Sequence, residues 1–303
     1  MNIFKTAILF GATATIFLAA TAKQTAVAGT LTLGWNYTKD AEHNDSLGGV
    51  EHYEIYGMAV KDDLAANTIW VAISANLPVT GINTGATVNG MPVSNGNIGW
   101  GDLFFDFSGK NSYQSANDTN SLFGIRFAPN NDSKAPSTGV YSGVKATSVV
   151  TENAGWWNLH NHHAGLKKKT GLEAGMGDLA WNDPYYGIYT TPTTFDRSSN
   201  HIPNIIASGK KVGDITMVGD AELAAAGFAL GILPRGSQTI GFKFDKSLLP
   251  VGSYTASLLE ECNNDAMAIE GETKVPEPSS ILATLLGVGA IAARRKRQQK
   301  LAV

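Results

Sequence analysis

Cysteine is almost absent from this chain of 303 residues, because Cys262 is the only one. No disulfide bond can therefore join two parts of one chain, and the hydrophobic core has to supply the stability. We expect Cys262 to be a small buried hydrophobic side chain. A disulfide bond between two chains, or a redox role, is the alternative.

Long apolar runs are also scarce. Near the C-terminus, Ile281–Ala293 is an apolar run of 13 residues. As a helix it would extend about 20 Å, whereas a bilayer core is about 30 Å thick. Four basic residues follow it, Arg294, Arg295, Lys296 and Arg297, and such residues favour the cytoplasmic side of a membrane. We expect transient membrane insertion with the bulk of the chain outside. A buried helix with a solvated basic tail, or a lasting anchor, is the alternative.

Familiar catalytic motifs are missing as well. The sequence contains neither G-x-S-x-G, the nucleophile motif of many hydrolases, nor H-E-x-x-H, a zinc-protease motif. Carboxylate pairs that hydrolyse glycosides are defined by their distance in space, which a sequence does not give. We expect no enzymatic activity, and a secreted carbohydrate-active enzyme is the alternative.

Basic residues are too few for a nucleic-acid-binding surface. The whole chain has 23 basic and 26 acidic residues. Seven of the basic residues and one acidic residue lie in the first 28 and the last 28 positions. Residues 29–275 therefore keep 16 basic and 25 acidic residues, a net charge of about −9. An acidic surface repels nucleic acid and anionic membranes.

The N-terminal residues indicate export. Residues 1–28 contain a basic residue, Lys5, then an apolar stretch over Ala7–Ala22 and then Ala26-Val27-Ala28. This order is that of a secretory signal peptide, with Ala26 and Ala28 forming an A-x-A site for signal peptidase. We expect cleavage to leave Gly29 as the new N-terminus. A first helix of the folded domain is the alternative.

The last 30 residues carry a specific order of features. Residues 274–303 contain Pro276-Glu277-Pro278, then the short apolar run and then the Arg/Lys cluster. This order resembles the PEP-CTERM sorting signal of bacteria that carry exosortase, a membrane-embedded transpeptidase-like protease. The resemblance implies that exosortase recognises Pro276, Glu277 and Pro278 and cuts nearby. It also implies that the basic cluster orients the chain and that the product reaches the cell surface or extracellular matrix.

Six stretches between the two tails carry a second resemblance. They are YEIYGMAVKDD (53–63), WVAISANLPVTG (70–81), GWGDLFFDF (99–107), LFGIRFAPNNDS (122–133), GVYSGVKATSV (139–149) and TIGFKFDKSLLPVGSYTASLLEECNNDAMAIEGE (239–272). They resemble the XDD3-type exosortase-dependent surface proteins, which are mostly cyanobacterial and have no established enzymatic activity. The resemblance implies a structural or adhesive role linked to exopolysaccharide or biofilm.

Short β-rich runs separated by turns dominate the middle of the chain. They predict strands over 31–37, 52–60, 68–75, 102–107, 122–127, 140–150, 239–244 and 254–259, with 61–67 as a hairpin loop. One short helix is expected over Ala221–Ala226, with Asp220 as its N-cap and Gly227 at its end. We predict an all-β fold with a single β-sandwich over residues 29–273, for which a jelly roll is one arrangement. A signal peptide (1–28) and a short transmembrane sorting helix within 274–303 would flank it.

Five aromatic residues in Gly- and Asn-rich loops are candidates for carbohydrate binding. Aromatic rings stack on the apolar faces of sugars, and nearby amide side chains would bind the hydroxyl groups. The candidates are Trp156, Trp157, Trp181, Tyr185 and Tyr186. The alternative is that these large side chains pack in the core.

Metal ligands are the last candidate site. His160 and His162 would share one face if WWNLHNHH (156–163) were a strand. The oxygen-rich loops around Asp118 and Asp132, and EECNND (260–265), contain the ligand types that calcium prefers. No EF-hand pattern is present, and Asx turns are the alternative for the oxygen-rich loops. For the histidines, the alternative is that they are solvated loop residues. Apart from calcium, no cofactor is expected.

Overall fold

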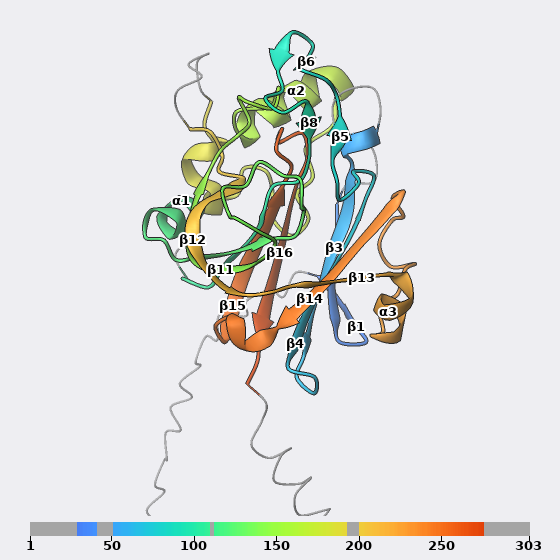
Figure 1. Cartoon of the computed structure of the whole chain (residues 1–303). Coiled ribbons are helices and arrows are strands. Elements are labelled where there is room, and N and C mark those ends of the chain that lie inside the picture. Colours follow the sequence, from blue (N-terminus) through green and yellow to red (C-terminus); the bar gives the residue numbers. More distant parts are fainter. Residues whose placement is uncertain (1–28, 41–50, 110–111, 193–199, 276–303) are drawn as a thin grey trace, which may run out of the picture.

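The computed structural model describes residues 29–40, 51–109, 112–192 and 200–275 (Figure 1). The long strands and their partners are β1 (Thr30–Thr32), β2 (Trp35–Lys39), β3 (Ile55–Asp63), β4 (Thr68–Ala75), β9 (Leu103–Asp106), β10 (Leu122–Arg126), β11 (Gly139–Thr147), β12 (Ile205–Gly213), β13 (Thr216–Val218), β14 (Gln238–Asp245), β15 (Gly252–Leu259) and β16 (Ala266–Thr273). Four two-residue strands lie between β4 and β9: β5 (Ile82–Asn83), β6 (Thr87–Val88), β7 (Met91–Pro92) and β8 (Asn97–Ile98). The helices are η1 (Glu51–Tyr53), α1 (Tyr113–Asp118), α2 (Leu159–Thr170), η2 (Pro184–Thr190), α3 (Asp220–Ala225) and η3 (Lys246–Leu248).

Two six-stranded antiparallel sheets dominate the structure. The first sheet has the order β1-β2-β3-β4-β14-β13, and the second has the order β12-β11-β10-β9-β15-β16. Each sheet contains a meander of four consecutive strands, β1–β4 in the first sheet and β9–β12 in the second. Two strands from the C-terminal part of the chain extend each meander, β13 and β14 in the first sheet and β15 and β16 in the second. The predicted all-β sandwich is confirmed, and the order is mainly that of two meanders rather than the paired Greek keys of a jelly roll.

Alternation along the strands separates an inner and an outer apolar layer. On β4, Ile69, Val71 and Ile73 lie in the core between the two sheets, whereas Trp70 and Ala72 lie on the other face. Neighbouring side chains of a strand point to opposite faces, so one β-rich run contributes to both layers. Full burial of each large apolar side chain in these layers stabilises the folded state by roughly 1.5–3 kcal/mol.

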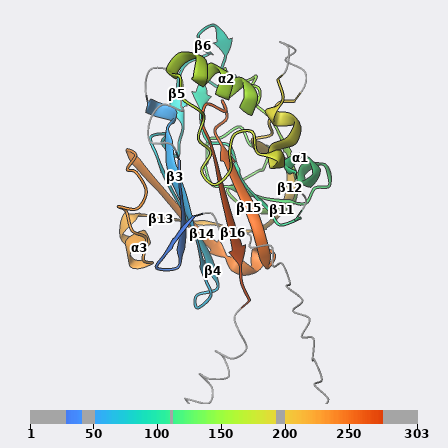
Figure 2. The same cartoon turned by 180° about the vertical axis from the view of Figure 1, so that it is seen from behind.

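Helices and loops cover the outer faces of both sheets (Figures 1 and 2). On the first sheet, the ring of Trp35 contacts Phe228, which follows α3, with 5.1 Å between the ring centroids. On the second sheet, Tyr113 of α1 contacts Tyr186 and Tyr189 of η2, at 6.2 and 6.1 Å. The sandwich therefore has three apolar layers, one between the sheets and one outside each of them.

The prediction of one helix is wrong, because the described residues form three α-helices. Helix α3 is the predicted one, but it begins at Asp220 and its N-cap is Gly219, which has no side chain to cap the helix. Helix α1 lies where a polar loop was expected, and its N-cap Ser112 accepts a hydrogen bond from the N–H of Ser115 at 3.0 Å. Such a cap stabilises the first turn of the helix, which is short and consists mainly of polar residues with low helix propensity.

The single strand predicted over residues 31–37 is also wrong. Strands β1 and β2 form a tight hairpin there, with Leu33 and Gly34 at its turn. Both turn residues have positive φ angles, 52° and 83°, as a type I′ turn requires. By contrast, the predicted hairpin of the next two strands is confirmed, since β3 pairs with β4 through Val60 and Val71.

Candidate ligand pocket

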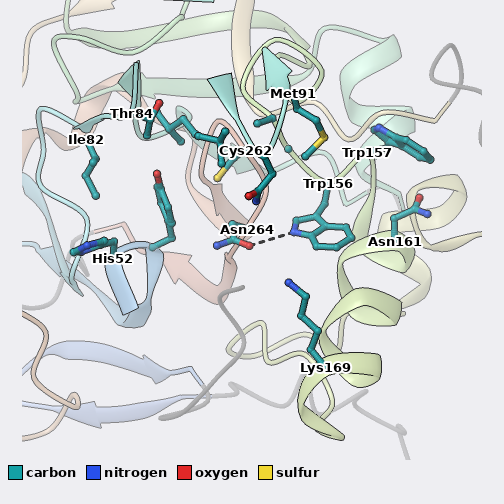
Figure 3. A pocket seen from close by; sticks show the side chains of 16 residues that line it. His52, Ile82, Thr84, Met91, Trp156, Trp157, Asn161, Lys169, Cys262 and Asn264 are labelled. Atoms are coloured by element: carbon teal, nitrogen blue, oxygen red, sulfur yellow. Dashed lines mark hydrogen bonds between the residues drawn. The ribbon is translucent and has the colours of Figure 1, made fainter. Parts of the chain in front are cut away.

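A pocket of about 650 Å³ lies at one end of the sandwich. Residues 82–98, which contain the four short strands, build one wall, and Trp156, Trp157 and helix α2 build another. Cys262 and Asn264, from the loop that joins β15 to β16, lie between these walls (Figure 3). The pocket therefore gathers side chains from distant parts of the sequence.

Backbone contacts hold these segments together. The N–H of Trp156 donates to the carbonyl of Cys262 at 2.9 Å, and the N–H of Ala154 donates to the carbonyl of Pro92, also at 2.9 Å. The side-chain amide of Asn263 donates to the carbonyl of Trp156 at 3.2 Å. The three sides of the pocket are thus joined through the segment 154–156.

The indole of Trp156 is fixed from two sides. Its Nε1 donates to Oδ1 of Asn264 at 3.2 Å (Figure 3). Its six-membered ring lies directly against Gly165 of α2, where an added Cβ would come within 2.4 Å of the ring. Glycine is therefore required at position 165 for the ring to occupy this place.

The loop 260–265 is buried, which is unusual for a polar hairpin loop. The carboxylate of Glu261 accepts hydrogen bonds from the backbone N–H groups of Gly99, at 2.6 Å, and Asp132. The carboxylate of Asp265 accepts from the N–H of Ile55 at 2.7 Å. These acidic residues therefore act as structural acceptors that join the hairpin loop to neighbouring loops.

Burial also changes the ionisation of this loop. It raises the pKa of Glu261 to about 8 and that of Glu260 well above its usual range. The Cys262 thiol lies 3.6 Å from a carboxyl oxygen of Glu260, and burial raises the pKa of the thiol as well. Cys262 is only 4% exposed, so the prediction of a small buried side chain is confirmed.

The five aromatic candidates do not form one surface. Trp156 and Trp157 line the pocket. Trp181, Tyr185 and Tyr186 lie instead in the apolar cover of the second sheet, where Tyr186 is fully buried and has no ring face open to solvent. Carbohydrate binding at all five residues stays a prediction, but only two of them share a pocket.

The two candidate histidines lie on helix α2 and not on a strand. Residues two positions apart on a helix are separated by about 200° around its axis, so His160 and His162 do not share a face. His162 is buried with its ring 6.2 Å from that of Trp156, whereas the ring of His160 lies 5.8 Å from that of Trp181. The strand assumed for this pair is therefore wrong.

The two candidate aspartates already have protein partners. Asp118 forms an ion pair with Lys145 at 2.9 Å. Asp132 accepts hydrogen bonds from the side-chain amides of Asn95 and Asn153, at 2.6 and 2.8 Å. In the part of the chain that the structure describes, no three His, Cys, Asp or Glu side chains are grouped so that they could hold a metal ion.

The predicted signal peptide (1–28) lies outside the described residues, and so does the sorting segment from Pro276 onward. This applies to Ala26 and Ala28 and to the whole motif, apolar run and basic cluster. Within the described ranges, no helix combines the length and the apolar character that crossing a membrane requires.

Comparison with known proteins gives no relatives. No protein-family model matches this chain, and neither a curated protein nor a solved structure is significantly similar to it.

Proposed function

We propose that this chain is an exported surface protein, cut by exosortase at Pro276-Glu277-Pro278 and delivered to the cell surface or extracellular matrix. Signal peptidase would remove residues 1–28 first, and the membrane would hold the C-terminal segment only until the cut. The role of the product is structural or adhesive and not catalytic. The order of the terminal segments in the sequence supports this proposal.

One structural observation supports it most: a polar clamp ends the described domain just before the motif. The clamp consists of Asp62, Lys246 and Lys274. Lys246 is buried, with only 6% of the residue exposed. Its ammonium donates to Oδ1 of Asp62 at 2.6 Å and to the carbonyl of Lys274. The N–H of Lys274 donates to Oδ2 of Asp62 at 2.7 Å. A cut at Pro276 or beyond therefore leaves the clamp and both sheets intact.

The pocket and the clamp lie at opposite ends of the domain. Strand β16 begins at Ala266, beside the buried hairpin loop, and ends at Thr273, next to the clamp. Its eight residues span about 25 Å. Figure 1 shows α2 and the short strands at one end and the end of β16 at the other. A protein attached through its C-terminal end would thus present the pocket to its surroundings.

Replacement of Pro276, Glu277 and Pro278 by alanine in the full chain tests the proposal. We expect the variant to accumulate uncut in the membrane fraction of its native host, with at least a tenfold loss of the surface form, because the protease would no longer recognise it. Cell fractionation with an antibody against the domain measures this. Glu272→Ala, which changes an exposed residue just before the motif, should leave delivery unchanged.

Delivery of the triple variant at the level of the unchanged protein would refute processing at this motif. Retention of the Glu272→Ala control as well would show instead that any change near the end of β16 blocks export. The carbohydrate-active alternative has no observation in its favour beyond Trp156 and Trp157, which line the pocket.

A further inference from the structure

We propose that the pocket binds a small amphipathic anion, with an apolar body between the two walls and an acidic head group at Lys169. This inference does not depend on processing by exosortase. It rests on the composition of the lining, on the position of its charged groups and on the size of the cavity.

The body of the pocket is mainly apolar. Segment 82–98 contributes the apolar side chains of Ile82, Val88, Met91 and Ile98 and the polar side chains of Thr84 and Asn89. Ile82 lies across the pocket from the indole of Trp156 (Figure 3). A volume of about 650 Å³ lies within the range of 300–1,000 Å³ that is usual for small-molecule sites. An alkyl or aryl group would bury its surface here at roughly 25 cal/mol per Å².

The ionisable side chains of the lining favour a negative ligand. Among the residues that the structure describes, the lining contains Lys169 and His52, the weak acids Tyr53 and Cys262, and no carboxyl group. Burial raises the pKa of both weak acids, so they are neutral near pH 7. Glu260, with a carboxyl oxygen 3.6 Å from the thiol of Cys262, also has a pKa raised by burial. A ligand with one negative charge would therefore meet positive charge without a competing carboxylate in the lining.

Lys169 is positioned to contact such a head group. It extends from the last turn of α2 toward Asn264 and Trp156 (Figure 3). It forms no ion pair with any residue that the structure describes, whereas Lys167, one half-turn earlier, pairs with Glu173. Its charge is therefore available to a ligand.

A neutral sugar would fit this lining poorly. Each sugar hydroxyl that enters an apolar wall loses its hydrogen bonds to water, at a cost of about 1–3 kcal/mol when no partner replaces them. Asn264, a polar side chain of the lining, already accepts the Trp156 Nε1–H through its Oδ1. The four apolar side chains of segment 82–98 thus disfavour a polyhydroxylated ligand, to which only Thr84 and Asn89 of this segment offer polar groups.

Displacement of a fluorescent probe tests the inference. The protein as isolated from its host, in detergent-free buffer, would be loaded with 1-anilinonaphthalene-8-sulfonate and titrated with decanoate, decanol or maltohexaose. We expect decanoate to displace the probe at least ten times more effectively than decanol, and maltohexaose not to displace it. The tenfold factor corresponds to about 1.4 kcal/mol for one charge-assisted contact.

Two lysine variants locate the charged contact. Lys169→Met should weaken decanoate about tenfold and leave decanol unchanged, because only the head-group contact is lost. Lys168→Met, on the same helix but outside the lining, is the matched control and should bind as the unchanged protein does. Met91→Glu, which places a carboxylate in the apolar wall, should weaken both ligands.

Several results would overturn the inference. They are equal affinity for decanoate and decanol, displacement by maltohexaose, equal behaviour of the two lysine variants, and no binding of the probe or either C10 ligand. A melting temperature that matches the unchanged protein confirms that each variant is folded before its binding is compared.

Discussion

Between pH 6.5 and pH 8, the free energy of unfolding should fall by about 1.6 kcal/mol through Glu261 alone. Burial, together with the charge of Asp132, raises the pKa of Glu261 from 4.5 to about 8, although the N–H groups of Asp132 and Gly99 oppose this. In this pH window the folded protein keeps the proton that the unfolded chain has lost. Because the folded state binds more protons, stability decreases as pH rises. One pH unit is worth about 1.4 kcal/mol for such a group.

Other buried groups affect the same profile. Burial also raises the pKa values of Glu260 and Asp102, so both act in the same direction as Glu261. His163 acts in the opposite direction below pH 6.5, because burial lowers its pKa and the unfolded chain takes up a proton that the folded protein does not. Above pH 6.5 this opposing contribution fades as the histidine of the unfolded chain loses its proton, so the carboxyl groups dominate the window.

Urea unfolding at pH 6.5 and pH 8 measures this decrease. Glu261→Gln removes one titrating group and should reduce the slope, and the slope that remains belongs to the other buried acids. The variant should be less stable overall, because an amide offers one acceptor oxygen to two N–H donors. Glu272→Gln, which removes an exposed carboxyl group, should keep the original slope. Stability that is constant or rises across this window would show that Glu261 is ionised in the folded protein.

Gly155→Ala should destabilise the protein by about 3 kcal/mol and abolish the pocket. A Cβ at position 155 would lie 2.4 Å from the carbonyl oxygen of Cys262 and 2.7 Å from its Cα. Both atoms belong to the backbone, so no side-chain rotation relieves the clash. The hairpin loop and the segment around Trp156 would have to separate, which breaks the hydrogen bond between Trp156 and Cys262.

Gly231→Ala is the matched control for this prediction. An added Cβ at position 231 meets nothing within 4 Å, so its effect should stay within about 0.5 kcal/mol. Chemical denaturation gives both values, and the probe of the pocket gives the loss of binding. A Gly155→Ala protein with unchanged stability would mean that the hairpin loop does not pack against Gly155 as described.

The strands of the sandwich were predictable where alternation was strong. The run that becomes β4 alternates between the inner core and the outer cover, and its pairing with β3 followed from the short polar loop between them. Strand β12 was missed because its later half contains Gly209, Lys210 and Lys211, which are exposed at the edge of a sheet. Strand β16 was missed because it contains Gly271 and two glutamates.

Helix α2 shows what the sequence could have revealed. Its interior of histidine, asparagine and glycine has low helix propensity, which favoured a loop or strand. Its ends are nevertheless typical: Asn158 accepts a hydrogen bond from the N–H of Asn161 at 2.9 Å, and Gly171 has a positive φ of 79°. Asn158 and Gly171 enclose the twelve residues of the helix, and this pair of capping residues was the signal from which the helix could have been predicted.

The pocket itself was beyond the reach of the sequence. Trp156 and Trp157 were identified as candidates, but the apolar wall lies in a segment that the sequence shows only as a series of turns. Its residues meet the tryptophans through long-range backbone contacts such as that between Ala154 and Pro92. The burial of the loop 260–265 was equally hidden, because a polar hairpin loop is expected to be exposed.

The intact mass of the mature protein, purified from the surface of its native host, tests the account most directly. The proposal predicts a chain that begins at Gly29, ends close to Pro276-Glu277-Pro278 and lacks the cluster Arg294–Arg297. A mass that includes this cluster would contradict processing at the motif and would mean that the chain keeps its C-terminal segment.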